Sequence, residues 1–170
     1  MIDIEGLATG PESTILTIAA QGFDPLGDGW YEEHFYYARI TLESQPQRTI
    51  EQSTIDWWAT QKEAQVEAFA EEGRVDLDHA LQDLARLCRK SRLIWMNGPT
   101  YDATILENAY KSYGMALPWN YYSVRDARTV YGLWPDLPKP PTSHHALQDC
   151  QRQIVLLQNC LQHLKIQQLK

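Results

Sequence analysis

The residues Met1-Ile2-Asp3-Ile4-Glu5-Gly6 alternate apolar and acidic side chains. A period of two residues is typical of a β-strand, and it places Asp3 and Glu5 on one face with Ile2 and Ile4 on the other. Neighbouring carboxylates repel each other and are costly to bury, and a bound divalent cation relieves both costs. Taken alone, the pattern more often marks an amphipathic edge strand with a solvated acidic face. The rest of the chain favours the metal site, because it supplies two more aspartates and a histidine.

The composition is that of a soluble globular protein. The 170 residues are 44% hydrophobic and 22% charged, which fits one domain spanning residues 1–170 with a substantial core. No apolar run reaches the length of a membrane span and no signal peptide precedes Asp3, so we expect no membrane association. The three cysteines, Cys88, Cys150 and Cys160, lack C-x-x-C spacing, and we interpret them as reduced thiols of a cytoplasmic protein.

The net charge limits the kinds of nucleic-acid partner. With 15 basic and 22 acidic residues the chain carries a formal charge of −7. A protein that coats nucleic acid needs Lys and Arg to neutralise phosphates, so this charge argues against a coating or architectural role. An enzyme that grips a few nucleotides is compatible with this charge if metal ions reverse the local field.

Hydrophobic patterns predict an α/β fold with a mixed five-stranded sheet, built as a three-strand meander and then αβ units, with flanking helices. Strands are expected at residues 1–6, 14–23, 31–42 and 92–98, and residues 123–126 lead into a short helix capped by Asp126. Further helices are expected at 53–58, 63–72, 77–88, 101–113 and 145–169. Four prolines exclude regular structure from residues 133–143.

Local signals refine several of these helices. Ser53 and Asp56 resemble a capping box, and Asp76 is placed to cap the helix that follows it. Trp57 and Trp58 are expected to be core residues. On the last helix the glutamines are expected to face solvent, while its apolar stripe faces the core: Ile154, Leu157, Leu161 and Leu164.

Three stretches carry side chains suited to chemistry: Asp3-Ile-Glu5, the strand-to-helix junction Asn97-Gly-Pro-Thr-Tyr-Asp102, and His144-His-Ala-Leu-Gln-Asp149 at the start of the last helix. Each has a simpler explanation when taken alone. Asp102 suits the first turn of any helix, Asp149 suits a solvated helix face, and a single histidine beside a loop is usually a surface residue. Their joint presence, in this order, favours a catalytic site.

At these residues the sequence resembles the DEDDh group of 3′→5′ exonucleases, which have the ribonuclease-H-like fold. The group's pattern is Asp-x-Glu, a later Asp and then His-x-Ala-x-x-Asp, and residues 144–149 match the last element at every defined position. The likeness covers nearly the whole chain. It looks closest to the phage and exonuclease-eight-like branch, which is similar to mycobacterial-type exoribonucleases, through residues 53–58, 95–106 and 126–129. One departure is Gly6, where most members carry Thr, and it bears on how the terminal nucleotide is seated.

The resemblance implies two Mg²⁺ or Mn²⁺ ions. Hard cations of this kind take oxygen ligands, and two of them suit phosphodiester hydrolysis. By this likeness Asp3 bridges both ions, Glu5 and Asp149 hold the ion that carries the nucleophile, and Asp102 serves the second ion. His144 is then the general base, since a neutral imidazole takes a proton near neutral pH.

The expected reaction removes 5′-mononucleotides from the 3′ end of single-stranded or overhanging DNA or RNA. The resemblance implies that Leu7 and Asn97 bind the substrate. Four aromatic residues look exposed and are candidates for base stacking or for a homodimer interface: Tyr121, Tyr122, Tyr131 and Trp134.

Two other functions remain open at the level of sequence. One is a non-catalytic nucleic-acid-binding protein that retains the fold. The other is a His-Asp metal phosphohydrolase, suggested by His144 and His145 with Asp149. Such a protein needs further histidines near acids, and His79 with Asp83 is only a weak candidate for that second group.

The neighbouring histidines compete for the role of general base. Residues four apart share a helix face, so a regular helix would place His145 next to Asp149 and favour His145 as the base. The family spacing selects His144 instead. Because prolines continue to Pro141, we expect the helix to begin only around His145, which frees His144 to turn toward the metals.

Overall fold

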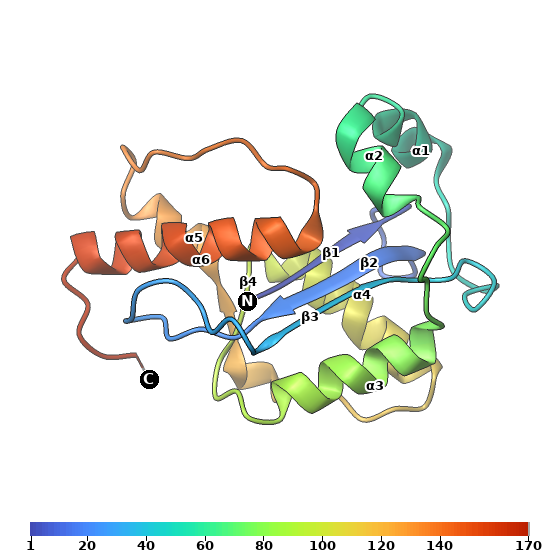
Figure 1. The fold of residues 1–170 in the computed structure, drawn as a ribbon. Helices are drawn as coiled ribbons and strands as arrows, with labels where there is room; N and C mark the ends of the chain where they lie inside the picture. Colours follow the sequence, from blue (N-terminus) through green and yellow to red (C-terminus); the bar gives the residue numbers. More distant parts are fainter. Residues whose placement is uncertain (170) are drawn as a thin grey trace.

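A five-stranded mixed sheet lies between two layers of helices in the computed structural model, which describes residues 1–169 (Figure 1). The strand order is β3-β2-β1-β4-β5. An antiparallel meander of β1 (Ile2–Gly6), β2 (Ile15–Gln21) and β3 (Phe35–Arg39) is followed by β4 (Ile94–Met96) and β5 (Val124–Asp126), which continue the sheet in parallel. The predicted fold class is therefore confirmed, and the edge-strand interpretation of residues 1–6 is wrong, because β1 is the middle strand.

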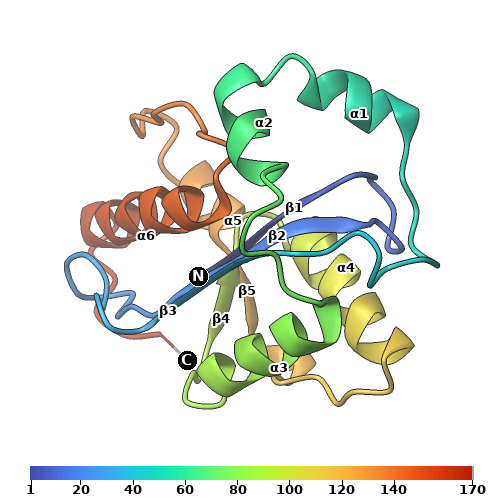
Figure 2. The ribbon, with the colours of Figure 1, turned by 45° about the vertical axis from the view of Figure 1, so that its right-hand side comes forward.

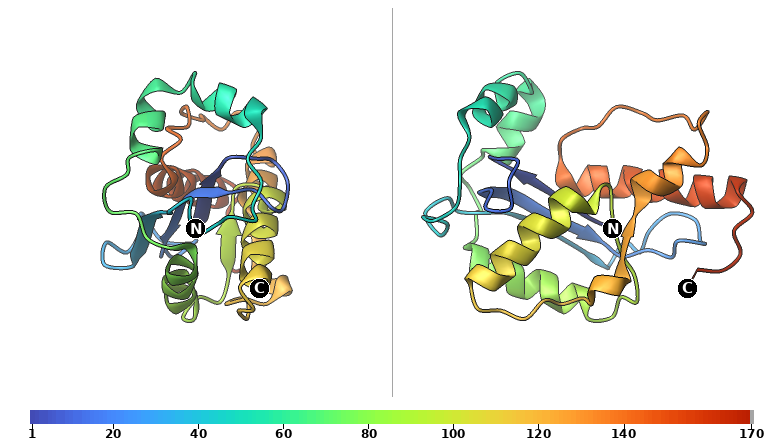
Figure 3. Two further views of the ribbon diagram at one scale, coloured as in Figure 1. Left: turned by 90° about the vertical axis from the view of Figure 1, so that its right-hand side faces the viewer. Right: turned by 180° about the vertical axis from the view of Figure 1, so that it is seen from behind.

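The helices are α1 (Gln52–Trp58), α2 (Lys62–Ala68), α3 (Leu77–Cys88), α4 (Pro99–Ser112), α5 (Ala127–Gly132) and α6 (Ala146–His163), with a 3-10 turn at Tyr121–Ser123. Two of them, α3 and α4, cover one face of the sheet, and α5 and α6 cover the other (Figures 1 and 3). The remaining pair, α1 and α2, lies beyond the carboxyl end of β1 (Figures 1 and 2). None of the helices within residues 1–169 is long and apolar enough to cross a membrane.

The alternation in β1 divides its side chains between the two layers. Ile2 and Ile4 belong to the core beneath α3 and α4, whereas Met1 packs with α5 and α6 on the face that Asp3 and Glu5 share. Strand β2 is buried along its whole length, as expected for a strand covered on both sides. A third, smaller core of Leu7, Leu16, Trp58 and Ala68 attaches α1 and α2 to the sheet.

Several predicted boundaries are wrong. Strand β3 is shorter than predicted, because residues 22–34 form a long loop whose backbone at Asp24 and Gly29 bonds to Gln158 of α6. Helix α6 begins where expected but ends at His163, before Lys165 with φ 56°. Its glutamines do not all face solvent, since Gln153 and Gln158 are only 2% and 7% exposed.

Of the predicted helix caps, the one at Asp126 is confirmed and the others differ from the prediction. Asp126 caps α5 by accepting from the amide of Arg128 at 3.0 Å, as predicted. Asp76 occupies the cap position of α3, but its carboxylate accepts from the hydroxyl of Thr41 instead. The capping box of Ser53 and Asp56 is wrong, because α1 already begins at Gln52.

Candidate active site

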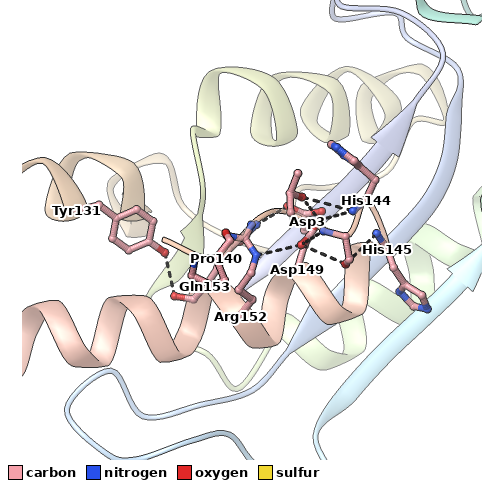
Figure 4. A network of polar contacts seen from close by, with 10 residues as sticks. Asp3, Tyr131, Pro140, His144, His145, Asp149, Arg152 and Gln153 are labelled. Atoms are coloured by element: carbon pink, nitrogen blue, oxygen red, sulfur yellow. Dashed lines mark hydrogen bonds and ion pairs between the residues drawn. The ribbon is translucent and has the colours of Figure 1, made fainter. Parts of the chain in front are cut away.

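The carboxyl end of β1 is the point where the strand order reverses, with β2 and β3 on one side and β4 and β5 on the other. In open α/β sheets, ligands bind at such a switch point. Asp3 points toward α6, and its Oδ1 accepts a hydrogen bond from Gln153 Nε2 at 2.7 Å (Figure 4). Glu5 lies on the same face of β1, near Asp149 at the start of α6. Burial, with the nearby charge of Asp149, raises the pKa of Asp3 to about 7.

Gly6 follows these acids at a β-bulge and leaves no room for a side chain. A Cβ atom at this position would lie 2.7 Å from Ser13 Oγ and 2.8 Å from Tyr101 Oη. The two hydroxyls therefore fill the space beside Glu5 that a larger residue at position 6 would need.

Asp102 reaches the same place from the turn after β4. Gly98 adopts φ 101°, a conformation that favours glycine, and Pro99 then opens α4 so that Asp102 falls in its first turn. Beyond the last paired residues of β1 and β4, the amide of Ile4 donates to Asp102 Oδ1 at 3.2 Å. Burial, followed by the charge of Asp3, raises the pKa of Asp102 well above its usual value.

Asp149 holds the end of the proline-rich loop against α6. Its carboxylate accepts from the hydroxyl of Thr142, from the amide of Ser143 at 3.1 Å and from the amide of His144 at 3.0 Å. Arg152 Nε lies 3.2 Å from Asp149 Oδ1, and its Nη1 donates to the carbonyl of Pro140 at 3.3 Å (Figure 4). Although burial opposes ionisation, these hydrogen bonds and the Arg152 charge lower the pKa of Asp149.

One donor atom each from Glu5, His144 and Asp149 lies within 4.8 Å of the other two. Burial raises the pKa of Glu5 well above its usual value, and repulsion from Asp3, Asp149 and Asp102 adds to the shift. Burial lowers the pKa of His144, which keeps its imidazole neutral at neutral pH. The group thus combines crowded carboxylates with a neutral proton acceptor.

The rings of His144 and His145 point in different directions (Figure 4). His144 lies just outside α6 with φ 52°, and its ring meets the edge of Trp57 at a centroid distance of 4.8 Å. His145 is the residue that precedes α6, and its ring stacks on Tyr37 at 4.8 Å. Trp58 is buried as predicted, but Trp57 is 40% exposed, so its assignment to the core is wrong.

Tyr37 also connects β3 to α2. Its hydroxyl hydrogen-bonds Glu67 of α2, and Arg39 Nη1 lies 3.7 Å from the same carboxylate. Tyr37 therefore joins His145, the residue before α6, to helix α2 beyond β1.

The donor set fits a hard divalent cation. Asp3, Glu5, Asp102 and Asp149 offer carboxylate oxygens, the ligands that Mg²⁺ and Mn²⁺ prefer, and three of the four have raised pKa values that a cation would reverse. Asp149 would have to exchange some of its present donors for a cation.

The two predicted substrate-binding residues lie in different settings. Asn97 is half-buried in the turn after β4, where its carbonyl accepts from Arg128 Nη2 at 3.0 Å. Leu7 is 1% exposed and packs with Trp58, so its side chain supports α1 in this structure. Contact of either residue with a substrate stays a prediction.

The four aromatic residues predicted to be exposed differ in their exposure and contacts. Tyr121 and Tyr122 are 87% and 63% exposed, while Trp134 stacks on His163 at 3.9 Å. Tyr131 is buried, and its hydroxyl donates to the carbonyl of Gln153 at 2.9 Å, so its expected exposure is wrong.

The sequence analysis missed Gln153 as part of the site. A signal was present, because Gln153 follows Asp149 by four residues and precedes the core residue Leu157 by four. That spacing places all three on one helix face.

Taken together, the mixed sheet and the acidic group at its switch point define an α/β protein of ribonuclease-H-like architecture with a candidate site for divalent cations. A family model, that of the 3′-5′ exoribonuclease Rv2179c-like domain, matches residues 1–161, and the chain belongs to this family. Among solved structures it is similar to cell-death related nuclease 4 (CRN-4), with a TM-score of 0.60 and 11% identity over 95% of this chain. The chain corresponds to 63% of the length of CRN-4. No match was found among curated proteins.

Proposed function

We propose that this chain is a metal-dependent 3′→5′ exoribonuclease of the DEDDh type, which releases 5′-mononucleotides from single-stranded or overhanging 3′ ends. The observation that carries the proposal is the meeting of Glu5, His144 and Asp149 within 4.8 Å at the switch point of the sheet. Membership of the exoribonuclease family favours RNA over DNA as the substrate.

Four carboxylates serve as ligands for two Mg²⁺ or Mn²⁺ ions in this proposal: Asp3, Glu5, Asp102 and Asp149. Bound ions would neutralise the crowded carboxylates, attract the scissile phosphate and make a water molecule more acidic. The protein's own contribution is to hold these oxygens in place, from one strand, β1, and two helices, α4 and α6.

His144 acts as the general base. Its lowered pKa leaves the imidazole unprotonated at neutral pH, so it can accept a proton from the attacking water. The water oxygen bonds to phosphorus as the bond from phosphorus to the 3′-oxygen breaks. That 3′-oxygen then takes up a proton to become the new 3′-hydroxyl, and the released nucleotide keeps the 5′-phosphate.

A direct test is digestion of RNA and DNA strands labelled at either end, with Mg²⁺, Mn²⁺ or EDTA. We expect mononucleotides from 3′-labelled RNA at once and a shrinking ladder from 5′-labelled RNA, with no product in EDTA. Cleavage of a closed circular strand would show endonuclease action and contradict the proposal, as would full activity in EDTA.

The His-Asp phosphohydrolase reading finds no support in the site. It needs additional histidines near the four acids of the site, whereas the ring of His145 stacks on Tyr37 and the acidic neighbours of His79, an exposed residue of α3, are Asp76 and Asp78. The non-catalytic alternative would predict no mononucleotide release in the same digestion.

A further inference from the structure

We propose that Gln153 is a positioning residue that orients Asp3 for cation binding, an inference that rests on the proposed function. By the family resemblance Asp3 would serve both ions, so the orientation of its carboxylate would affect the binding of each. Gln153 gives the only hydrogen bond that the side chain of Asp3 accepts from residues 1–169, at 2.7 Å.

The orientation of the Gln153 amide follows from its partner. In the structure the NH₂ group faces Asp3 and the carbonyl oxygen points away. A cation-binding Asp3 requires this orientation, because an ionised carboxylate only accepts hydrogen bonds. That oxygen, Oε1, is buried and finds no donor within the described part of the chain. A buried acceptor without a donor lowers stability, so the fold tolerates a cost at this residue that Met or Leu would avoid.

Gln153 is fixed before any ligand arrives. Its side chain is 2% exposed, and its backbone carbonyl accepts from the buried hydroxyl of Tyr131 at 2.9 Å. The same helix face carries Asp149 one turn earlier (Figure 4). One rigid helix therefore supplies a predicted ligand and the group that aims a second ligand on β1.

The neutral amide suits this role better than a charged side chain. Lys or Arg would also donate to Asp3, but the added positive charge would oppose a cation at the same carboxylate. Gln153 directs one oxygen of Asp3 and leaves the charge of the site unchanged. Hydrogen-bond partners of metal ligands typically act in this way, and their loss weakens metal binding or activity by about 10- to 100-fold.

The chain contains a matched control in Gln158. It lies on the same helix and is 7% exposed, but its amide bonds to Asp24 and Gly29 of the loop after β2. Replacing either glutamine by Met removes a buried amide while keeping side-chain length. Only Gln153→Met removes a donor to Asp3.

The experiment is calorimetric titration of the full chain with Mn²⁺, alongside thermal unfolding in EDTA. We expect Gln153→Met to weaken Mn²⁺ binding by about 10- to 100-fold, and Gln158→Met to lower the melting temperature while binding Mn²⁺ like the unaltered protein. If Gln153→Met does not fold, Gln153→Asn makes the same comparison, because its shorter side chain keeps an amide that falls short of Asp3.

The inference is overturned if the Gln153 variant binds Mn²⁺ normally, or if both glutamine variants lose affinity equally. Its failure is separable from that of the proposed function. An unaltered protein that degrades RNA but shows no Gln153 effect disproves this inference alone, whereas an unaltered protein that binds no Mn²⁺ and degrades no RNA disproves both.

Discussion

His144 adopts a backbone conformation with φ 52°, which residues other than glycine seldom occupy. The amide of His144 donates to Asp149 at 3.0 Å, and this bond offsets the strain of the conformation. Strained residues of this kind are concentrated at functional sites, because the surrounding structure must hold them. The conformation turns the ring of His144 away from the first turn of α6 and toward Glu5.

The two histidines should therefore differ sharply on mutation. His144→Ala should lower turnover by about 10²- to 10⁴-fold, the usual loss for a general base, with Mn²⁺ still bound. His145→Ala should leave turnover nearly unchanged and lower the melting temperature, because it removes the stacking on Tyr37. Steady-state kinetics of both variants decide the matter, and the opposite ranking would identify His145 as the base.

Asp3 makes the metal-free protein sensitive to pH. The pKa of Asp3 is raised from 3.8, its ordinary value, to about 7 in the folded protein. The stability that Asp3 contributes is therefore fully present below pH 3.8 and is lost as the pH rises through about 7. Asp3→Asn cannot ionise, and in EDTA it should be more stable than the unaltered protein at pH 8. This advantage should grow by roughly 2 kcal/mol between pH 5.5 and pH 8, since one pKa unit corresponds to about 1.4 kcal/mol. Urea unfolding at both pH values measures it, and an advantage that shrinks with pH would refute the assignment.

At the scale of elements, α2 is tied to β3 by the hydrogen bond between Tyr37 and Glu67. Tyr37→Phe should destabilise the protein by about 1 kcal/mol, because Glu67 loses its donor but keeps Arg39 nearby. Amide hydrogen exchange should rise in α2 and stay unchanged in α3. Tyr36→Phe is the control, since the buried hydroxyl of Tyr36 has no hydrogen-bond partner among residues 1–169 and its removal should cost nothing. Equal effects of the two substitutions would show that the bond to Glu67 does not hold α2.

The elements that the sequence predicted well are those decided by near neighbours. The alternation of β1, the cap at Asp126 and the start of α6 after the prolines all depend on residues within a few positions. The start of α1 was missed because it depends on the tertiary structure: the amide of Glu51 donates to the carbonyl of Leu7, just after β1, and its carboxylate accepts from Thr9. Gln153 was missed for the same reason, since its partner Asp3 lies 150 residues away.

At the scale of the whole molecule, cation binding should stabilise the fold by mass action. A concentration of Mn²⁺ about 100 times the dissociation constant corresponds to about 2.7 kcal/mol. For a chain of this length the melting temperature should rise by roughly 5–10 °C. Thermal unfolding with and without Mn²⁺ measures the shift, and Asp3→Asn should largely abolish it. An equal shift in that variant would place the bound ion elsewhere.

The order of the site residues along the chain could be predicted, whereas their charge states could not. Asp3, Glu5, Asp102 and Asp149 stand out by motif, yet Asp149 alone has a lowered pKa. That difference arises in part from Arg152, which lies three residues after Asp149 on α6, and in part from Thr142 and Ser143, whose approach depends on how the proline-rich loop folds back over α6.

The close packing at Gly6 means that residues 6, 13 and 101 should change together during evolution. Because Ser13 Oγ and Tyr101 Oη occupy the space of a side chain at position 6, Gly6→Thr alone forces both hydroxyls to move. Ser13→Ala together with Tyr101→Phe removes both hydroxyls and leaves only the carbonyl of Thr14 close, at 3.2 Å from the same Cβ position, so the order in which these mutations accumulate should matter. Relatives with Thr at this position should therefore differ at the positions of Ser13 and Tyr101 as well, a covariation visible in their sequences.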